Sequence, residues 1–210
     1  MTPRPYHPHE RQRTVDAGRE RALAAAREVL NLDDVGAFSL DAVAKKAGVT
    51  RMTLYNQFGS KGQLLAEVFD TLVERDAFSR AQEAFTQPDV GLAFDGIVAI
   101  FGQFYTDNRA LMTKLAAVAG LDPDLDEAMR SRNMRRRRVV ETLVQRLGKR
   151  HRAAVADAEL VNTLDVLLSF ATFNAIAGLD RTPKQVVPHM RRMIRGVLGL
   201  PAKPAGNARR

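Results

Sequence analysis

Thr50, Arg51, Met52 and Thr53 are consecutive residues at the predicted start of a short helix, and their side chains suit the recognition of DNA bases. A guanidinium can donate two hydrogen bonds to a guanine edge, while hydroxyl and apolar side chains can contact other base edges. The first turn of a helix that enters a major groove is the part that reaches those edges. The pattern therefore predicts base reading by Arg51, with Met52 and Thr53 as further contacts.

Neighbouring side chains suit the phosphate backbone of DNA. Tyr55, Asn56 and Lys61 can donate hydrogen bonds to phosphate oxygens, and the hydroxyls of Ser39 and Thr50 can do the same. Simpler interpretations stay open, because Ser39 and Thr50 are also good helix caps and Tyr55 can simply pack. These residues together predict a surface that binds duplex DNA.

Two short helices around a tight turn are needed to position these residues. Ser39 is a suitable N-cap for the first helix, Gly48 follows its last apolar residue, and Thr50 can cap the second helix. Apolar residues recur at helical spacing in between. The segment 60–63 reads as a capping box that starts a further helix. This is the pattern of a helix-turn-helix, in which the second helix is placed to enter a major groove.

The sequence FSLDAVAKKAGVTRMTLYNQFGSKGQLL, which begins at Phe38, resembles the DNA-binding domain of the TetR family of bacterial transcriptional regulators. The resemblance implies a homodimeric repressor that a small molecule releases from a palindromic operator. The positions of Tyr55 and Lys61 match the family's usual phosphate contacts. The family often has Gly, Ala or Pro near Met52 and His near Asn56, so these departures leave the operator sequence open.

Charge and composition are consistent with a DNA partner. The 210-residue chain has a net charge of +8 and a sequence pI near 10.3, which suits a polyanion. Residues 1–70 hold 10 Lys or Arg and 9 Asp or Glu, so they carry only +1 of this charge. Specific phosphate contacts, and not a broad basic field, would therefore provide most of the DNA affinity.

Other kinds of chemistry lack their residues. The chain has no Cys, which excludes a disulfide framework and thiolate chemistry, and it shows neither a glycine-rich phosphate loop nor a zinc-binding spacing. The histidines, His7, His9, His151 and His189, are scattered without an identifiable partner. We therefore expect no enzyme activity, no metal and no cofactor.

No secretory signal is recognised at the start of the chain, and the most apolar run is too short to span a bilayer. The expectation is a cytoplasmic protein with no membrane partner.

An all-α chain with two domains is predicted. Its predicted parts are a mobile arm (1–12), a helix-turn-helix domain (13–72), a helical ligand-binding and dimerisation domain (73–200) and a disordered tail (201–210). In the second domain, helices are expected at 74–86, 90–106, 109–119, 124–148, 156–177 and 184–198. The last two are apolar on more than one face, and we expect them to form a two-fold dimer interface, with core burial as the alternative. The proposed interface residues are Leu164, Phe170, Met190, Ile194 and Val197.

Aromatic and Met side chains crowd the middle helices and predict an apolar effector pocket. The candidate lining residues are Phe101, Phe104, Tyr105, Met112, Met134, Arg137, Phe170, Phe173 and Asn174. If Arg136 or Arg137 reaches the pocket, an anionic ligand such as an aromatic or fatty carboxylate is preferred.

Several alternatives stay open for the second domain. Its aromatic residues could only fill the core, and the arginine-rich run 130–138 could be a solvated face. The protein could also be a helix-turn-helix DNA binder without an effector, or a helical lipid- or acyl-carrier-binding protein.

Overall fold

The computed structural model describes residues 8–31, 38–72, 77–148, 157–178 and 181–201 of the chain, and this part holds helices and no strand. The chain divides into two compact units. The first comprises Met1–Thr71 together with Thr113–Met129, and the second comprises Leu72–Met112 together with Arg130–Arg210. The predicted all-α fold is confirmed. The segment 113–129, which was expected in the second domain, groups with the first unit.

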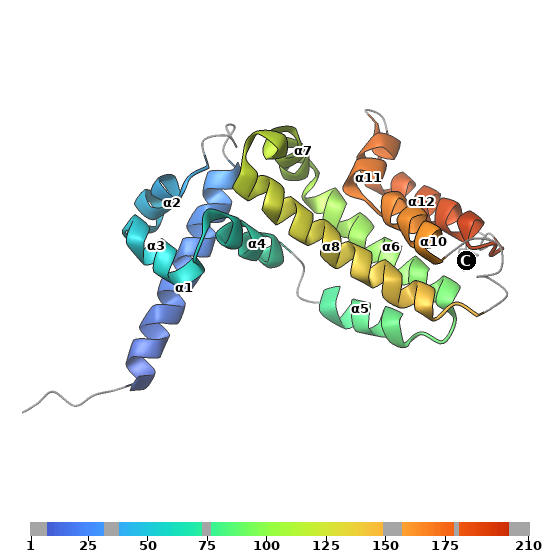
Figure 1. The fold of residues 1–210 in the computed structure, drawn as a ribbon, viewed down its shortest axis with the longest axis horizontal. Coiled ribbons are helices and arrows are strands. Elements are labelled where there is room, and N and C mark those ends of the chain that lie inside the picture. Colours follow the sequence, from blue (N-terminus) through green and yellow to red (C-terminus); the bar gives the residue numbers. More distant parts are fainter. Residues whose placement is uncertain (1–7, 32–37, 73–76, 149–156, 179–180, 202–210) are drawn as a thin grey trace, which may run out of the picture. The chain divides into compact units, whose positions relative to one another are not determined.

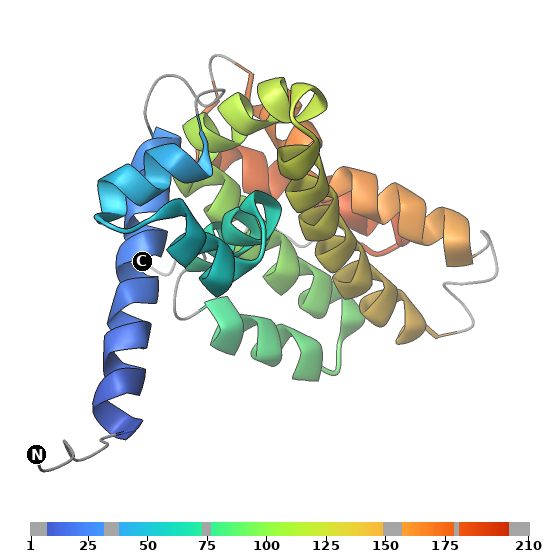
Figure 2. The ribbon, with the colours of Figure 1, turned by 60° about the vertical axis from the view of Figure 1, so that its left-hand side comes forward.

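The first unit is built on four helices, α1 (Pro8–Asn31), α2 (Leu40–Ala47), α3 (Arg51–Phe58) and α4 (Lys61–Thr71). Figures 1 and 2 show the short helices α2 and α3 beside the longer α1. Their shared core is apolar and nearly inaccessible to solvent. It includes Ala22, Ala26, Leu30, Val43, Leu54, Phe58, Leu64, Leu65, Val68 and Phe69.

The helix α1 starts earlier than the sequence indicated. It begins at Pro8, so residues 8–12 are helical although they were assigned to the mobile arm, while residues 1–7 lie outside the described part. A proline is tolerated in the first turn because the N–H it lacks has no intrahelical partner there.

Arg19 on α1 connects three helices of the first unit. Its guanidinium donates to the carbonyl of Gln57 at 2.8 Å and to the Glu67 carboxylate at 2.6 Å, and it lies 4.6 Å from the ring centroid of Phe58. The charge pattern of α1 gave no sign of this role, because both partners are distant in the chain. These contacts fix the end of α3 against α1 and α4.

The second unit is organised around α6 (Val90–Asp107), which packs closely against α5 (Ala77–Thr86) and α12 (Pro183–Val197). A Cβ at Gly102 would lie 2.3 Å from Cγ2 of Val187, and one at Gly96 would lie 3.1 Å from the Cβ of Ala84. Glycine at these two positions therefore allows the close approach of both neighbours. The core of the unit includes Phe94, Ile97, Val98, Tyr105, Met112, Leu143, Phe173, Val186 and Met190.

Two further helices contribute residues to both units. α7 (Arg109–Val118) is followed by the 3-10 turn η2 (Ala119–Leu121) and by α8 (Pro123–Gln145). Asp122 is the residue before α8, and its Oδ1 accepts hydrogen bonds from the backbone N–H groups of Asp124 (3.1 Å) and Leu125 (3.3 Å). It therefore caps α8, with proline at the first helical position.

The single helix predicted over 156–177 is wrong, because it is interrupted. α10 (Asp157–Leu167) and α11 (Phe170–Ala177) are separated at Ser169, which has extended backbone angles. The Ser169 hydroxyl accepts from the N–H of Thr172 at 3.2 Å, and the Thr172 hydroxyl donates to the carbonyl of Val166 at 2.6 Å. These local side-chain bonds replace helix bonds and restart the helix in a new direction.

The last helix, α12, begins at Pro183 and continues through Pro188. The backbone N–H of Thr182 donates to Oε1 of Gln185 at 2.9 Å, as expected for the predicted capping box. The alternative that Pro188 delays the start of this helix is therefore wrong.

Within the described residues, no single helix combines the length and the apolar character needed to cross a membrane. Only α10 and α11 taken together, with a 47° bend between them, meet that test by length and composition.

Candidate nucleic-acid interface

The turn between α2 and α3 has the geometry of a helix-turn-helix. The Ser39 hydroxyl accepts from the N–H of Ala42 at 3.2 Å and caps α2, which ends at Gly48 with φ of 67°. This left-handed conformation favours glycine, and the Gly48 N–H donates to the carbonyl of Ala44. The Thr50 hydroxyl then accepts from the N–H of Thr53 at 3.1 Å and caps α3. The three capping roles predicted from the sequence are confirmed.

The face of α3 that points away from the core carries the predicted base-reading residues. Leu54 and Phe58 are buried, whereas Met52 is 65% exposed and Tyr55 is 57% exposed. Large exposed apolar side chains that lie close together on one helix often indicate a contact surface. Packing within the protomer does not account for Tyr55. Arg51 and Asn56 are also exposed and Thr53 is half-buried.

Arg51 is held by a neighbouring acid that sequence reasoning missed. Its Nη1 lies 3.0 Å from Oδ2 of Asp41 on α2, and both side chains are about two-thirds exposed, at 66% and 68%. Exposed ion pairs of this kind contribute about 0–1 kcal/mol, so little energy is needed to exchange Asp41 for another acceptor. Asp41 can therefore orient Arg51 without preventing it from binding a base.

A concavity of about 340 Å³ brings together the predicted phosphate contacts. It is lined by Ser39, Leu40, Asp41, Arg51, Tyr55, Ser60, Lys61 and Asp124. The predicted residues Ser39, Arg51, Tyr55 and Lys61 are in this set, and Thr50, Met52, Thr53 and Asn56 are not. Ser60 is a member that the prediction left out, although its capping motif was visible in the sequence.

The starts of α2 and α4 both border this concavity, through Ser39 and Ser60. Helix N-termini favour anions because their first N–H groups and the helix dipole are positive. Ser39 and Ser60 accept bonds from backbone N–H groups as caps, but each hydroxyl keeps its own proton as a donor. Capping and phosphate binding are therefore compatible at both residues, while Asp41 and Asp124 oppose an anion.

Lys61 is engaged within its own unit. Its ammonium forms an ion pair with the carboxylate of Asp122, and the two side chains are 18% and 28% exposed. It also lies 5.9 Å from the ring centroid of Phe38. A Cβ at the adjacent Gly62 would lie 3.1 Å from the carbonyl oxygen of Asp124, so α4 approaches the start of α8 closely. The phosphate contact predicted for Lys61 stays a prediction, and it requires exchange of Asp122 for phosphate.

The environment of Asp122 favours its charged form. Burial acts to raise its pKa, but hydrogen bonds from Lys61 and from the backbone of Leu125 and Asp124, together with the Lys61 charge, outweigh burial and lower the pKa. The carboxylate is thus ionised at neutral pH and competes for Lys61.

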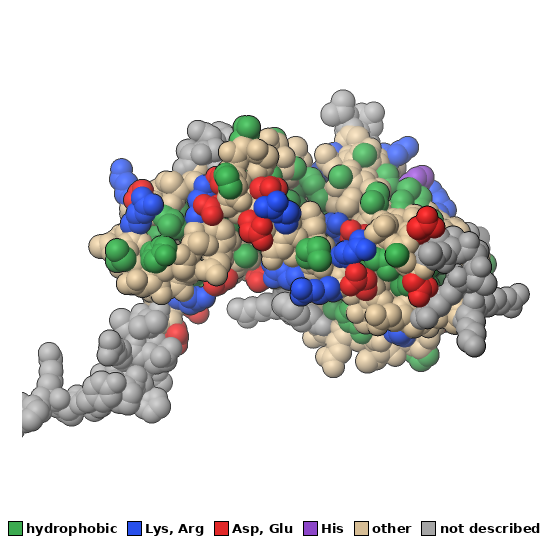
Figure 3. Space-filling model, viewed as in Figure 1, with side chains coloured by type: hydrophobic (Ala, Val, Ile, Leu, Met, Phe, Trp, Pro, Cys, Tyr) green, Lys and Arg blue, Asp and Glu red, His purple; other side chains and the backbone are tan. Residues whose placement is uncertain are grey.

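Positive and negative side chains are interspersed on the face of the molecule that Figure 3 shows. This distribution agrees with the small net charge of residues 1–70. Affinity for DNA would then depend on placed contacts such as Arg51 and Lys61 more than on a broad positive field.

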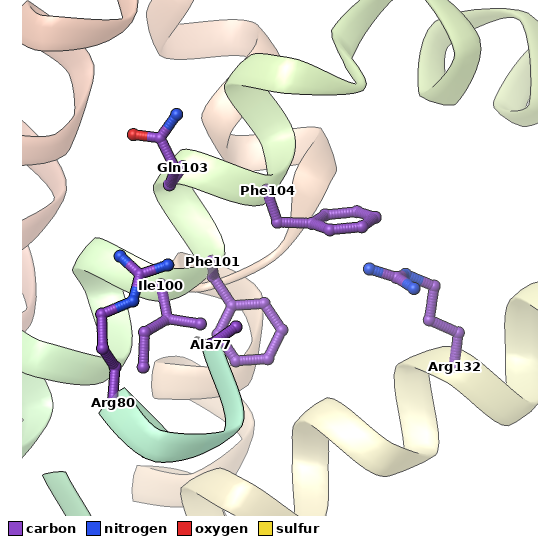
Figure 4. A pocket seen from close by; sticks show the side chains of 7 residues that line it. All are labelled: Ala77, Arg80, Ile100, Phe101, Gln103, Phe104 and Arg132. Carbon is purple, nitrogen blue, oxygen red and sulfur yellow. The ribbon is translucent and has the colours of Figure 1, made fainter. Parts of the chain in front are cut away.

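The predicted effector residues do not all meet at one cavity. Phe101 and Phe104 of α6 line a cavity of about 130 Å³, which Figure 4 shows together with the other residues around it. The remaining lining residues are Ala77, Arg80, Ile100, Gln103 and Arg132. Met112 is buried in the core, and Met134 is 51% exposed. Asn174 accepts a hydrogen bond from Nε of Arg109 at 2.9 Å.

Tyr105, Phe170 and Phe173 form an aromatic cluster in the second unit. The ring centroid of Tyr105 lies 5.5 Å from those of Phe170 and Phe173, and its hydroxyl donates to the carbonyl of Leu168 at 3.1 Å. Burial raises the pKa of Tyr105, although the nearby Arg136 acts in the opposite direction. The alternative of core filling is the better description of these three residues.

The arginines singled out by sequence have partners. Arg136 is buried, as its position on the apolar stripe indicated, and its Nε donates to the Asp165 carboxylate at 2.8 Å. Nε of Arg137 lies 3.1 Å from Oε1 of Glu141, and its Nη1 donates to Asn162 at 2.8 Å. Neither arginine is among the residues that line the cavity of Figure 4.

Most of the residues proposed for the dimer interface lie inside the protomer. Leu164, Phe170, Met190 and Ile194 are buried, and Val197 is 41% exposed. The same helices also carry exposed apolar residues, among them Val166 of α10. A second copy would have to cover this exposed side.

Comparison with known proteins places the helix-turn-helix among bacterial regulators. Residues 22–68 match the description of bacterial regulatory proteins of the tetR family. The HTH-type transcriptional regulator AlkX of Mycobacterium tuberculosis is 32% identical over 108 residues, which are 51% of this chain and 50% of that protein. The chain therefore aligns with about half the length of this curated relative.

Solved structures share the fold over most of the chain. A transcriptional regulator from Rhodococcus sp. Rha1 has a TM-score of 0.59 and 21% identity, covering 86% of this chain and 96% of its own. A TetR transcription regulator from Haloarcula marismortui has a TM-score of 0.61 and 13% identity, covering 88% of this chain and 97% of its own. At these identities the likeness is one of fold.

Proposed function

With a TetR-family helix-turn-helix near its N-terminus and the fold of solved TetR regulators, this chain is of the TetR type, and we propose that it regulates transcription by binding an operator in duplex DNA. The observation that supports this most directly is the surface of α3. Arg51, Met52 and Tyr55 are exposed together on a helix whose opposite face is anchored by Leu54 and Phe58.

The contacts divide into base readers and phosphate binders. Arg51, Met52 and Thr53 lie in the first turn of α3, where a helix in the major groove reaches base edges. Ser39, Tyr55, Ser60 and Lys61 surround a concavity bordered by two helix N-termini, which suits a phosphate. Thr50 and Asn56 add contacts at the edge of the same helix. The protein thereby sets its register through phosphates and its specificity through bases.

A homodimer would present two such helices to a palindromic operator, because the symmetry of the protein then matches that of the site. Since Leu164, Phe170, Met190 and Ile194 are core residues, the interface would use the exposed side of α10, α11 and α12. Val166, which is 62% exposed, and Val197 are the apolar residues on that side.

Repression relieved by a small molecule is the mode we propose, with the cavity of Figure 4 as the effector site. An effector regulates only if it binds the DNA-competent and DNA-incompetent states with different affinity. A DNA binder without an effector is the second candidate. It is favoured by the burial of Tyr105, Met112 and Phe173, which fill the core instead of lining a cavity.

Selection of genomic DNA fragments by the purified full chain, followed by sequencing, tests the function. The expected result is enrichment of fragments that share a palindromic sequence, with weaker enrichment by Arg51→Ala. A selection that yields no common sequence, at an ionic strength where non-specific binding is suppressed, would contradict operator recognition.

A further inference from the structure

The cavity in the second unit has an apolar wall. Ala77 of α5 and Ile100, Phe101 and Phe104 of α6 provide most of its surface (Figure 4). Its volume is about 130 Å³. An engineered apolar cavity of about 150 Å³ in another protein binds benzene, so this space is comparable to a single aryl ring or a short alkyl chain. Size and lining thus select a small apolar group.

Two arginines face this apolar space from different helices. Arg80 rises from α5 beside Ile100, and Arg132 reaches from α8 toward the ring of Phe104 (Figure 4). Among the described residues that line the cavity, none is acidic. The charges that border the space are therefore both positive. A cation would be repelled there, whereas an anion would reduce the cost of placing guanidinium groups next to apolar surface.

Stacking orients Arg132. Its guanidinium carbon lies 4.0 Å from the centroid of the Phe104 ring, which is the geometry of a cation–π contact. The N–H donors of a guanidinium lie in its own plane, and stacking involves the face, so the stack does not consume these donors. A planar carboxylate matches the fork of donors that such an arginine presents.

We propose that this cavity binds an amphipathic carboxylate, with the aryl or short alkyl group between α5 and α6 and the carboxylate at Arg80 and Arg132. As the effector site, it rests on the function proposed above, and it adds the chemical class of the effector. The arginines that determine this preference are Arg80 and Arg132, whereas the sequence pointed to Arg136 and Arg137.

The test uses three probes with one apolar part and different charge: 3-phenylpropanoate, 3-phenylpropan-1-ol and 3-phenylpropan-1-amine. Binding to the full chain without DNA is measured by calorimetry at fixed ionic strength. The carboxylate should bind about tenfold more tightly than the alcohol, as expected for a charge-assisted pair of hydrogen bonds. The amine should bind more weakly than the alcohol.

Variants locate the preference. Arg80→Met and Arg132→Met keep an unbranched apolar stem, so alcohol binding should persist, while the preference for the carboxylate should fall about fivefold or more. Arg138→Met removes the same charge from an exposed position on α8 and should change nothing. If a Met variant loses alcohol binding too, Arg132→Lys replaces it, and this variant should keep part of the preference because it keeps the charge.

Equal binding of alcohol and carboxylate, absence of binding by all probes, or an equal loss in Arg138→Met would overturn the inference. Operator binding is measured separately, with and without 3-phenylpropanoate. A bound carboxylate that leaves operator affinity unchanged would contradict effector control and leave the site assignment standing. Operator binding that survives while no probe binds would contradict the site and leave DNA recognition standing.

Discussion

Replacing Asp122 with Asn should increase operator affinity, because Asp122 competes with DNA for Lys61. The two side chains form a partly buried ion pair, and Lys61 also belongs to the concavity proposed for phosphate. For Lys61 to bind phosphate, the pair must open. Asp122→Asn removes the charge that holds Lys61, so the free energy needed to open the pair no longer opposes DNA binding.

The expected magnitude follows from the exposure of the pair. Exposed ion pairs contribute about 0–1 kcal/mol, and hydrogen bonds to charged groups contribute about 1.5–3 kcal/mol. At 18% and 28% exposure the Lys61–Asp122 pair lies between these cases, at about 1–2 kcal/mol. Operator affinity should therefore rise about 5- to 30-fold in Asp122→Asn.

Asn is the informative substitution because it keeps the helix cap. Oδ1 of Asp122 accepts from the N–H groups of Asp124 and Leu125, and an Asn amide oxygen can do the same. Asp122→Ala would lose this cap, which costs about 1 kcal/mol of stability in addition to the ion pair. Asp126→Asn removes the same charge from the first turn of α8 and is the matched control.

The assay is fluorescence anisotropy of a labelled operator over a range of salt concentrations. Lys61→Met should weaken binding and flatten the dependence of log K on log salt by about 0.9. In the Lys61→Met background, Asp122→Asn should have no effect, because its target is absent. An affinity gain that persists in that background, or that Asp126→Asn reproduces, would refute the competition.

Acid provides an independent check on the same pair. The folded-state pKa of Asp122 is lowered below its usual value of 3.8, so its contribution to stability is present above that pH and is lost as pH falls through the folded-state pKa. The difference in unfolding free energy between wild type and Asp122→Asn should be constant at neutral pH and should disappear in strong acid. A difference that grows as the pH falls would contradict the sign.

Three further changes test other parts of the molecule. Arg51→Ala should cost about 1–3 kcal/mol of operator affinity and relax the preference at one base pair, as read by binding to a set of operator variants. Val166→Glu places a charge on an exposed residue, so it should convert a dimer to monomers in light scattering without changing circular dichroism; an unchanged mass would exclude Val166 from the interface. Gly102→Ala should lower stability by about 1–3 kcal/mol in thermal unfolding because its Cβ overlaps Val187, whereas Gly196→Ala, with no described atom near its Cβ, should not destabilise.

Local chemistry made the helix-turn-helix predictable. The caps at Ser39 and Thr50 and the left-handed turn at Gly48 depend on residues within five positions of one another, and each has a short sequence signature. The break at Ser169 is also local, but an uninterrupted apolar run concealed it. Serine is tolerated within helices, and only its bond to Thr172 shows that it acts as a cap here.

Partners far apart in the chain could not be inferred in the same way. Arg19 contacts Glu67 on α4, and Lys61 contacts Asp122, and neither pairing leaves a periodic pattern in the sequence. A charged residue on a helix surface looks solvated until the neighbouring element is placed. For this reason Lys61 was predicted to contact phosphate without the carboxylate that competes for it.

The sequence by itself determined which residues are buried and which segments are helical, because apolar spacing and capping are properties of the chain alone. It could not determine what covers a buried face. Leu164, Met190 and Ile194 have the same spacing whether their own protomer or a second copy packs on them, and the tertiary structure assigns them to the protomer core. The register of α8 was likewise decided by packing, which brings Arg132 to the cavity and gives Arg136 to Asp165. Residues separated by one helical turn lie on the same face in any sequence pattern, so only the position of the neighbouring helices separates a ligand contact from a core ion pair.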